Sequence, residues 1–304
     1  MQHRSGYVPK LIDVAGFLAM SSFWGLNYVM VKFALVYEPP LMFLLFRVIF
    51  AAIFSLFLIK GGLKFPRDFM TNVKLVILSA LNITLFMGLW FIGESTESAS
   101  ISSILVYTYP IFSIVFSSIF LADRIGPLTI VGSILGFLGI VLIFIDQLSI
   151  SPGIGLVLLV LSALSWAGGT IFYKKYVHTT HPATVNAIQY IYALPFIVVW
   201  AFATESFSLA GITWQFLLIS LYVGVLGTAV AYFIYLKLYR EYSVPAISSY
   251  FFVVPALSIL FSFIILRETN TLFTYAGFIL VAAGIYLTSR CQRNGKQIAQ
   301  AISL

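Results

Sequence analysis

The sequence has few charged residues and almost no cysteine or histidine. Only 9% of its 304 residues are Asp, Glu, Lys or Arg, whereas about 25% is usual in soluble domains. The single cysteine, Cys291, excludes a disulfide framework and a cysteine-based metal site. No phosphate-binding glycine loop or Ser-His-Asp arrangement stands out, and the three histidines form no His-Glu-x-x-His pair. We therefore expect a protein that is not an enzyme and that carries no cofactor and no metal.

Long apolar runs dominate the chain, since 61% of its residues are hydrophobic. A helix of about 20 apolar residues crosses a hydrocarbon layer of about 30 Å, and it satisfies its own backbone groups. The sequence therefore predicts an all-α integral membrane protein. We expect ten transmembrane helices, at 11–36, 39–59, 73–93, 99–121, 127–145, 154–177, 182–204, 214–236, 244–266 and 273–289.

Basic residues are concentrated on one side of the predicted membrane. With a cytoplasmic N-terminus, 14 of the 17 Lys and Arg residues fall in cytoplasmic segments, only Arg267 falls outside, and Lys32 and Arg47 lie within spans. This distribution predicts a multipass protein of the plasma (inner) membrane with cytoplasmic N- and C-termini. The net charge of +7 then reflects topology and contact with the anionic headgroups of the lipid bilayer, so we expect no nucleic acid partner.

The chain contains an internal repeat. Trp24 aligns with Trp166 at a spacing of 142 residues, and Pro110 aligns with Pro255 at a spacing of 145. We expect a first five-helix repeat at 11–146, a second at 153–289 and a cytoplasmic tail at 290–304. Because five is an odd number, the second repeat must enter the membrane inverted. Inverted repeats are typical of secondary transporters, in which the two halves open a shared site to either side, although channels can also be built this way.

A permanent charge lies within the second predicted span. Arg47 is about 12 Å from the outer end of this span, counted at about 1.5 Å per residue. A charge near the membrane centre costs at least ~2.5–3.5 kcal/mol and nearly always faces a protein interior, a wet cavity or a partner. Two interpretations stay open at this point. Arg47 either braces helices and binds backbone carbonyls, or it has a substrate-binding or gating role.

The first span carries a polar face. Trp24, Tyr28 and Lys32 recur every four residues, with Asn27 beside them, so we expect this face to line a site. Lys32 can alternatively extend to the lipid headgroups. Glycines of the fifth and tenth spans, Gly132, Gly136, Gly139, Gly277 and Gly284, are expected to serve close helix packing.

Other candidate site residues come from the fourth, sixth, seventh and ninth spans. Pro110 and Pro255 predict kinks at equivalent places of the two halves, which is typical of a binding site near the membrane midplane. Tyr107 offers both a ring and a hydroxyl, whereas nearby serines can simply join helices. In the second half we expect contributions from Trp166, Tyr173 and Gln189. Because Gln189 stands where the first half has Arg47, the site should be asymmetric.

Carboxylates are absent from the middle of every predicted span. Glu94 and Glu97 fall at the outer end of the third span. Since membrane-buried carboxylates often serve as proton relays, such a relay is not expected here. Facilitated diffusion, exchange, or proton coupling through Lys32, Glu94 or another group remain as alternatives.

The combined pattern resembles the EamA-like transporters of the drug/metabolite transporter superfamily. The resemblance rests on the two five-span halves, FWGLNYVMVK at 23–32, Phe46-Arg47, the segment from Ser98 to Pro110, and LAD and LRE at 121–123 and 266–268. It implies a central cavity walled by spans one to four and six to nine, with spans five and ten peripheral. It also implies small metabolites, often amino acids leaving the cell, as cargo. The chain departs from the pattern at Asp123, Ala167 and Gln189.

We therefore expect a carrier that moves a small amphiphilic metabolite by alternating access, most simply in amino acid export. Arg47 would offer its charge to an anionic group, and aromatic walls would accept apolar parts. The alternatives are a channel or facilitative pore for small solutes, and a membrane enzyme or scaffold. The expected partners are a small-molecule substrate and the lipid bilayer, with the protein as a monomer or weak homodimer.

Overall fold

The computed structural model describes residues 11–302 except residues 60, 98, 148–152, 207 and 267–270. Every element in this part of the chain is helical. The first half contains α1 (Leu11–Ala34), α2 (Pro40–Phe57), α3 (Phe69–Ser79), α4 (Phe86–Thr96), α5 (Ala99–Val106), α6 (Tyr109–Phe120) and α7 (Pro127–Ile143). The second half contains α8 (Ile154–Phe172), α9 (Pro182–Thr204), α10 (Trp214–Gly224), α11 (Ala231–Glu241), α12 (Val244–Ser248), α13 (Val253–Leu266) and α14 (Leu272–Ile302).

Short segments of tighter or wider helix join several of these elements. Three are π-helical: η1 (Ala80–Leu85) between α3 and α4, η3 (Tyr173–Val177) after α8, and η5 (Val225–Val230) between α10 and α11. Three are 3₁₀-helical: η2 (Ile145–Gln147), η4 (Leu209–Gly211) and η6 (Ser249–Phe252). A π-helical segment leaves some carbonyls without their usual partner in the helix, and such segments occur frequently at functional sites.

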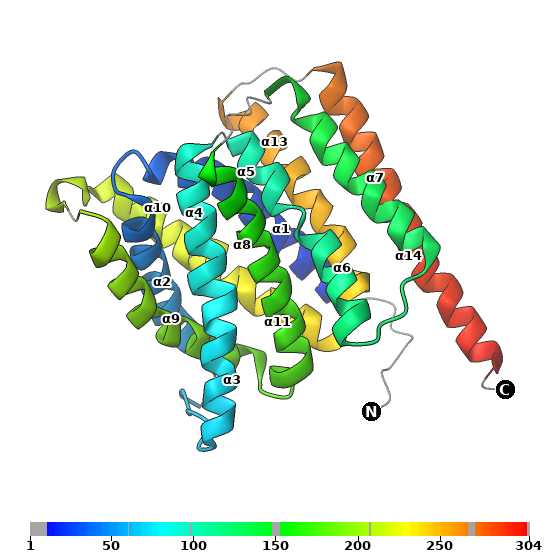
Figure 1. Ribbon diagram of the computed structural model, residues 1–304, viewed down its shortest axis with the longest axis horizontal. Helices are drawn as coiled ribbons and strands as arrows, with labels where there is room; N and C mark the ends of the chain where they lie inside the picture. Colours follow the sequence, from blue (N-terminus) through cyan, green and yellow to red (C-terminus); the bar gives the residue numbers. More distant parts are fainter. Residues whose placement is uncertain are drawn as a thin grey trace.

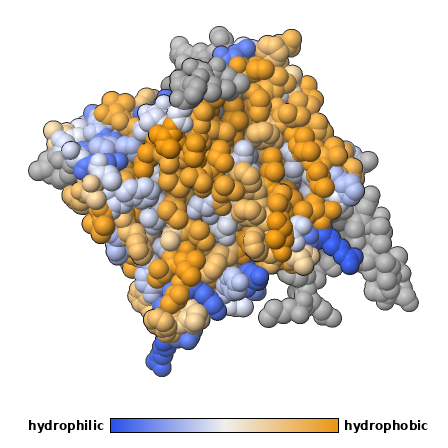
Figure 2. All heavy atoms as spheres, viewed as in Figure 1, coloured by the Kyte–Doolittle hydropathy of each residue, from blue (hydrophilic) through white to orange (hydrophobic). Residues whose placement is uncertain are grey.

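The dimensions and surface are those of a membrane protein. Within the described residues, nine helical segments are long and apolar enough to cross a membrane, and α7 is a shorter apolar helix of 17 residues. Apolar side chains cover the middle of the molecule and hydrophilic ones gather towards its edges (Figure 2). The prediction of an all-α integral membrane protein is thus supported, while the tenth crossing stays a prediction.

The predicted span boundaries differ from the observed helix boundaries mainly where a helix continues into polar sequence. The span predicted at 73–93 is too short, because the helix already begins at Phe69, where the carboxylate of Asp68 accepts the backbone N–H of Thr71 at 2.7 Å. This cap lies outside the apolar window that predicted the span. At the other end of the chain, α14 continues to Ile302 and includes most of the predicted tail.

Two spans are interrupted immediately before a proline. The helix α5 ends at Val106, and α6 restarts at Tyr109 with Pro110 in its first turn. In the second half, η6 separates α12 from α13, whose first turn contains Pro255. Proline fits the first turn of a helix because it has no N–H to leave unpaired there. Each span is thus interrupted near the predicted place, but the break lies before the proline, which stands in the first turn of the following helix.

The helices α7 and α14 run side by side along one edge of the bundle (Figure 1). Their glycines let the two backbones meet: a Cβ built at Gly277 would lie 2.6 Å from the carbonyl oxygen of Gly139. Gly132 and Gly284 approach each other in the same way, whereas Gly136 packs against the ring of Phe252. The prediction that these glycines serve close packing is confirmed.

Contacts between the two halves close the bundle at both ends. At the end where α1 begins, which we name the near end, Asp13 forms an ion pair of 2.9 Å with Lys237 and accepts the hydroxyl of Tyr242 at 2.8 Å. At the opposite end, which we name the far end, the carboxylate of Glu205 accepts the backbone N–H groups of Leu41 and Met42, each at 2.9 Å. Between the two ends lies the candidate site.

Candidate functional site

A small cavity lies between the two halves. Its volume is about 20 Å³, and about 10–15 Å³ is needed to hold one water molecule. The cavity therefore has room for water but not for a metabolite in this conformation. It is lined by Trp24, Asn27, Tyr28, Arg47, Phe86, Trp90, Val106, Tyr107, Trp166 and Tyr232.

Two lining residues of α1 are held by a π-helical segment of the other half. The carbonyl oxygen of Gly227 in η5 accepts the indole N–H of Trp24 at 2.9 Å and the amide of Asn27 at 3.4 Å. Glycine is required at this position, because a Cβ there would lie 2.5 Å from the Asn27 amide nitrogen. The polar face predicted for the first span thus faces the second half, with the Asn27 side-chain oxygen left without a partner.

Arg47 enters the cavity wall from α2 and is only 1% exposed. Its Nε donates a 2.7 Å hydrogen bond to the hydroxyl of Thr228 in η5. The guanidinium carbon lies 5.8 Å from the ring centre of Trp90 and 5.3 Å from that of Phe91, distances typical of cation–π contact. One terminal nitrogen, Nη1, has no hydrogen-bond partner. The arginine therefore braces the two halves with one donor and keeps another donor free.

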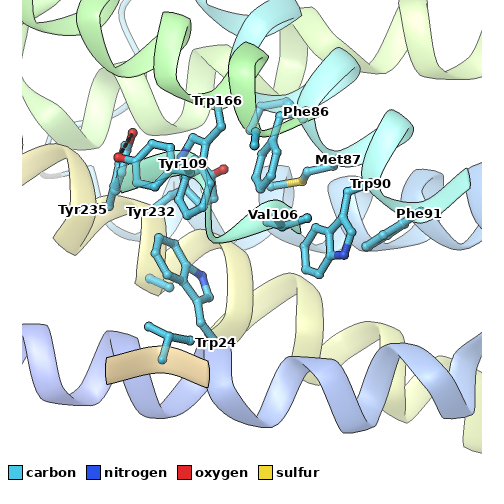
Figure 3. Close-up of a cluster of buried hydrophobic side chains, with 14 of the residues drawn as sticks. Trp24, Phe86, Met87, Trp90, Phe91, Val106, Tyr109, Trp166, Tyr232 and Tyr235 are labelled. Carbon is cyan, nitrogen blue, oxygen red and sulfur yellow. Dashed lines mark hydrogen bonds between the residues drawn. The ribbon is translucent and has the colours of Figure 1, made fainter. Parts of the chain in front are cut away.

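Aromatic rings form most of the remaining wall, as Figure 3 shows. The ring of Trp166 stacks on Tyr109 with 3.7 Å between centroids and on Phe86 with 4.6 Å. Trp24 meets Trp166 edge to face at 5.5 Å. Such offset and edge-to-face pairs are the preferred aromatic geometries. The faces of these rings can therefore accept apolar groups.

A network of hydroxyl groups closes the wall on the side of the near end. The hydroxyl of Tyr109 donates to that of Tyr239 at 2.8 Å and lies 3.1 Å from the Thr170 hydroxyl. The hydroxyl of Tyr235 forms a hydrogen bond with that of Thr170, and the hydroxyl of Ser248 lies 3.0 Å from that of Tyr239. Lys174 donates to the carbonyls of Tyr239 and Tyr242 beyond this network. These contacts separate the cavity from the near end.

Six of the eleven residues predicted for the site line the cavity: Trp24, Asn27, Tyr28, Arg47, Tyr107 and Trp166. The other five lie elsewhere. Lys32 is exposed on α1 one turn beyond Tyr28, and Pro110 and Pro255 are buried in α6 and α13. The hydroxyl of Tyr173 donates to the carbonyl of Leu236, and the amide of Gln189 donates to Asn186. A role in cargo binding stays a prediction for all eleven residues.

Four lining residues were not predicted: Phe86, Trp90, Val106 and Tyr232. Phe86 and Trp90 are four residues apart on α4 and share a face with Glu94, a spacing that the sequence does contain. Tyr232 belongs to a tyrosine stripe with Tyr235 and Tyr239 on α11. Val106 carries no signal, since an apolar residue lines a cavity or a core equally well.

Several buried polar atoms around the cavity lack hydrogen-bond partners. Besides the Asn27 oxygen and Arg47 Nη1, they include the indole nitrogens of Trp90 and Trp166 and both carboxylate oxygens of Glu94. Buried polar groups are normally paired, so an unpaired set calls for an explanation such as a ligand. Among the described residues, no three His, Cys, Asp or Glu side chains come together as metal ligands.

Comparison with known proteins identifies a family. A model of the EamA-like transporter family matches residues 11–145 and 153–290. The uncharacterized transporter YvbV of Bacillus subtilis (strain 168) is 32% identical over 281 residues, which cover 91% of this chain and 90% of that protein. A probable amino-acid metabolite efflux pump of Escherichia coli (strain K12) is 26% identical over 297 residues, covering 94% and 95%. A crystal structure that is 12% identical superposes with a TM-score of 0.80 over 94% of this chain and 99% of the other, which shows the fold alone.

Proposed function

Since the chain belongs to the EamA-like transporter family of the drug/metabolite transporter superfamily, we propose that this multipass membrane transporter carries a small amphiphilic metabolite by alternating access. The membrane is the plasma membrane, and both termini lie in the cytoplasm. The cargo is an amino acid or a related compound, and the direction is export. Two relatives whose printed name is probable amino-acid metabolite efflux pump support the cargo and the direction.

Two inverted repeats of five helices each supply the mechanism. In this arrangement α7, the fifth helix of the first repeat, also crosses the membrane and brings the number of crossings to ten. Support comes from the backbone as well as from the sequence: η1 begins at Ala80 and η5 at Val225, 145 residues apart. This is the spacing that relates Pro110 to Pro255. The π-helical segments thus occupy equivalent places in two halves of opposite orientation, as expected if each half takes the shape of the other when the access side changes.

The contacts at the two ends fit a closed intermediate of this cycle. The near end is joined through Asp13 and the far end through Glu205, and the cavity of about 20 Å³ between them is too small for cargo. Loading therefore requires one end to separate while the other stays joined. A channel would need both ends open at once.

The choice of cargo rests on a single observation, the Nη1 donor of Arg47 that has no hydrogen-bond partner. A buried Nη1 without a partner, beside aromatic rings, matches a carboxylate that carries an apolar group. A hydrogen bond from a charged donor contributes about 1.5–3 kcal/mol. Its removal should weaken cargo binding about 10- to 100-fold.

Reconstitution in liposomes tests this proposal. We expect saturable leucine or phenylalanine counterflow for the wild type and at least a tenfold loss for Arg47→Ala, with Arg47→Lys between them. Thr228→Val removes the brace but leaves the guanidinium, and is the matched control for helix bracing. Equal flux in wild type and Arg47→Ala, at equal thermal stability, would contradict the assigned role of Arg47. Conductance without saturation or counterflow would favour the channel.

A further inference from the structure

A second charged residue stands beside the candidate site, on α4. Glu94 is only 2% exposed, and neither carboxylate oxygen has a hydrogen-bond partner. It follows Trp90 by four residues on the same helix face, and Trp90 lines the cavity with its indole nitrogen unpaired. Figure 3 shows Trp90 at the α4 side of the aromatic wall. Glu94 thus lies one helical turn from the wall, towards the far end.

The groups that face Glu94 come from several helices. Lys32 and Tyr28 approach it from α1 and Arg47 approaches it from α2, all near enough for electrostatic interaction. The indole N–H of Trp90, one turn earlier on α4, also faces the carboxylate but lies outside direct hydrogen-bond geometry. The serines of α5 are uncharged, and α8, which packs along α4, contains no titratable residue. Glu97, the next carboxylate of the chain, packs against Gly155. Two cations are therefore near Glu94, yet neither donates a hydrogen bond to it.

A structural role does not explain this arrangement. A buried ionised carboxylate without a hydrogen-bond donor is costly, and structural carboxylates in proteins are paired. Glu205 illustrates the difference, since both of its oxygens accept backbone N–H groups. The cost at Glu94 can be relieved in two ways: a proton can neutralise the carboxylate, or a cationic group can enter and donate to it. The two are mutually exclusive, because both use the same oxygens.

We propose that Glu94 is the second pole of the cargo site and the group through which protons drive transport. This inference rests on the proposed function and deepens it. The cargo is a zwitterion whose carboxylate binds Arg47 and whose ammonium group binds Glu94. A proton occupies Glu94 when the ammonium is absent. Cargo and proton therefore alternate on one carboxylate, so a proton moves inwards for each zwitterion that moves outwards.

The unpaired indole of Trp90 supports this geometry. Its ring lies 5.8 Å from the Arg47 guanidinium and 5.4 Å from the Tyr28 ring. Trp90 therefore contacts the proposed anion-binding pole at Arg47 and lies one helical turn before the proposed cation-binding pole at Glu94. An amino acid presents its two charged groups within a few bond lengths of each other, so a single molecule can reach both poles once one end of the bundle has opened.

Proton release on binding tests the proposal in the purified full-length protein. Leucine is compared with 4-methylpentanoate, which is leucine without its amino group. We expect leucine binding to release protons from the wild type and to weaken up to tenfold per pH unit as the pH falls, whereas 4-methylpentanoate releases none. In Glu94→Gln, leucine affinity should fall at least tenfold, to that of 4-methylpentanoate, with no proton release. In liposomes, a proton gradient should drive leucine transport by the wild type but not by Glu94→Gln.

Glu97→Gln is the matched control, because Glu97 is a buried carboxylate directly after the same helix and lies outside the proposed site. It should keep proton release and gradient-driven transport. If Glu94→Gln does not fold, the proposal is tested by proton release from the wild type and by the same measurements on Glu94→Asp. Proton uptake or no proton movement on leucine binding to the wild type overturns the proposal, as does gradient-driven transport by Glu94→Gln. Arg47-dependent leucine counterflow without proton movement would overturn this inference alone. Absence of any amino acid flux would overturn the proposed function with it.

Discussion

The near and far ends of the bundle are joined by different chemistry. At the near end a carboxylate meets a cation and a hydroxyl: Asp13 pairs with Lys237 and Tyr242, and the tyrosine network lies behind them. At the far end a carboxylate meets only backbone N–H groups, as Glu205 caps the start of α2. Beside it, Glu38 is 2% exposed, and the backbone of Ser208 is near its carboxylate. At the near end the carboxylate has a cationic partner, whereas the two acidic groups of the far end contact no side-chain cation among the described residues.

This difference indicates that the two ends respond to different signals. The near end is joined by an ion pair with a hydroxyl partner, in which opposite charges attract each other. Two close acidic groups repel each other when both are ionised, and protonation of one removes the repulsion. In the proposed topology the far end faces the outside, where the proton concentration varies most.

The largest expected effect comes from breaking the near end. Asp13→Ala removes the only ion-pair partner found for Lys237 among the described residues and the acceptor of Tyr242. Since Lys237 is partly exposed, we expect a loss of about 1–3 kcal/mol in unfolding free energy. With Cys291 replaced by serine, a cysteine at buried Val244 should become reactive to a water-soluble reagent.

Tyr242→Phe sharpens this test, because it removes one hydroxyl and leaves the ion pair intact. The expected loss is smaller, about 1 kcal/mol. Labelling at Val244→Cys that is the same in the Asp13→Ala and wild-type backgrounds would mean that this ion pair does not hold the near end closed.

A smaller effect is expected at the far end. Glu205→Gln keeps one oxygen that can accept a hydrogen bond from the start of α2, but it loses the charge that the helix N-terminus favours. We expect a loss of about 1–2 kcal/mol and faster labelling of a cysteine at buried Ala34, with no change at Val244→Cys. Glu241→Gln, on the exposed near end of α11, is the control. Equal changes at both reporters would mean that the variant loosens the whole bundle.

The sequence predicted the helices better than the ends that join them. The spans at 154–177 and 182–204 coincide with the observed helices, because long apolar runs flanked by Gly153 and Pro182 define both limits. The contacts between the ends involve residues such as Asp13 and Lys237, which are 224 positions apart. No local pattern reports such a pairing. The hydrophobic window also places both residues at span ends, where charges are ordinary.

The site was predictable where a polar atom interrupts an apolar span. Arg47, Asn27 and Trp24 carry polar groups that lipid cannot satisfy, and all three line the cavity. Gln189 shows the limit of this reasoning, because its amide is used within the second half and does not reach the wall. Glu94 shows the opposite limit. Its position at the outer end of a span gave no sign of burial, but packing of α2, α5 and α8 around α4 buries it.

The smallest expected effect is a pH dependence confined to the far end. Burial raises the pKa of Glu38, and the charge of the nearby Glu205 raises it further. Burial also raises the pKa of Glu205, against the effect of the two backbone N–H groups that it accepts. A carboxyl group with a raised pKa binds its proton more tightly in the closed form. Its stabilisation of the closed far end is therefore full below the ordinary pKa and is lost as the pH rises through the raised value.

Labelling of Ala34→Cys, normalised to the unfolded protein at each pH, should slow a few-fold between pH ~8 and ~5. Glu38→Gln should remove most of this slope, and Val244→Cys should show none. A slope that survives in Glu38→Gln, or that is equal at both reporters, would mean that the acidic groups of the far end do not sense the proton.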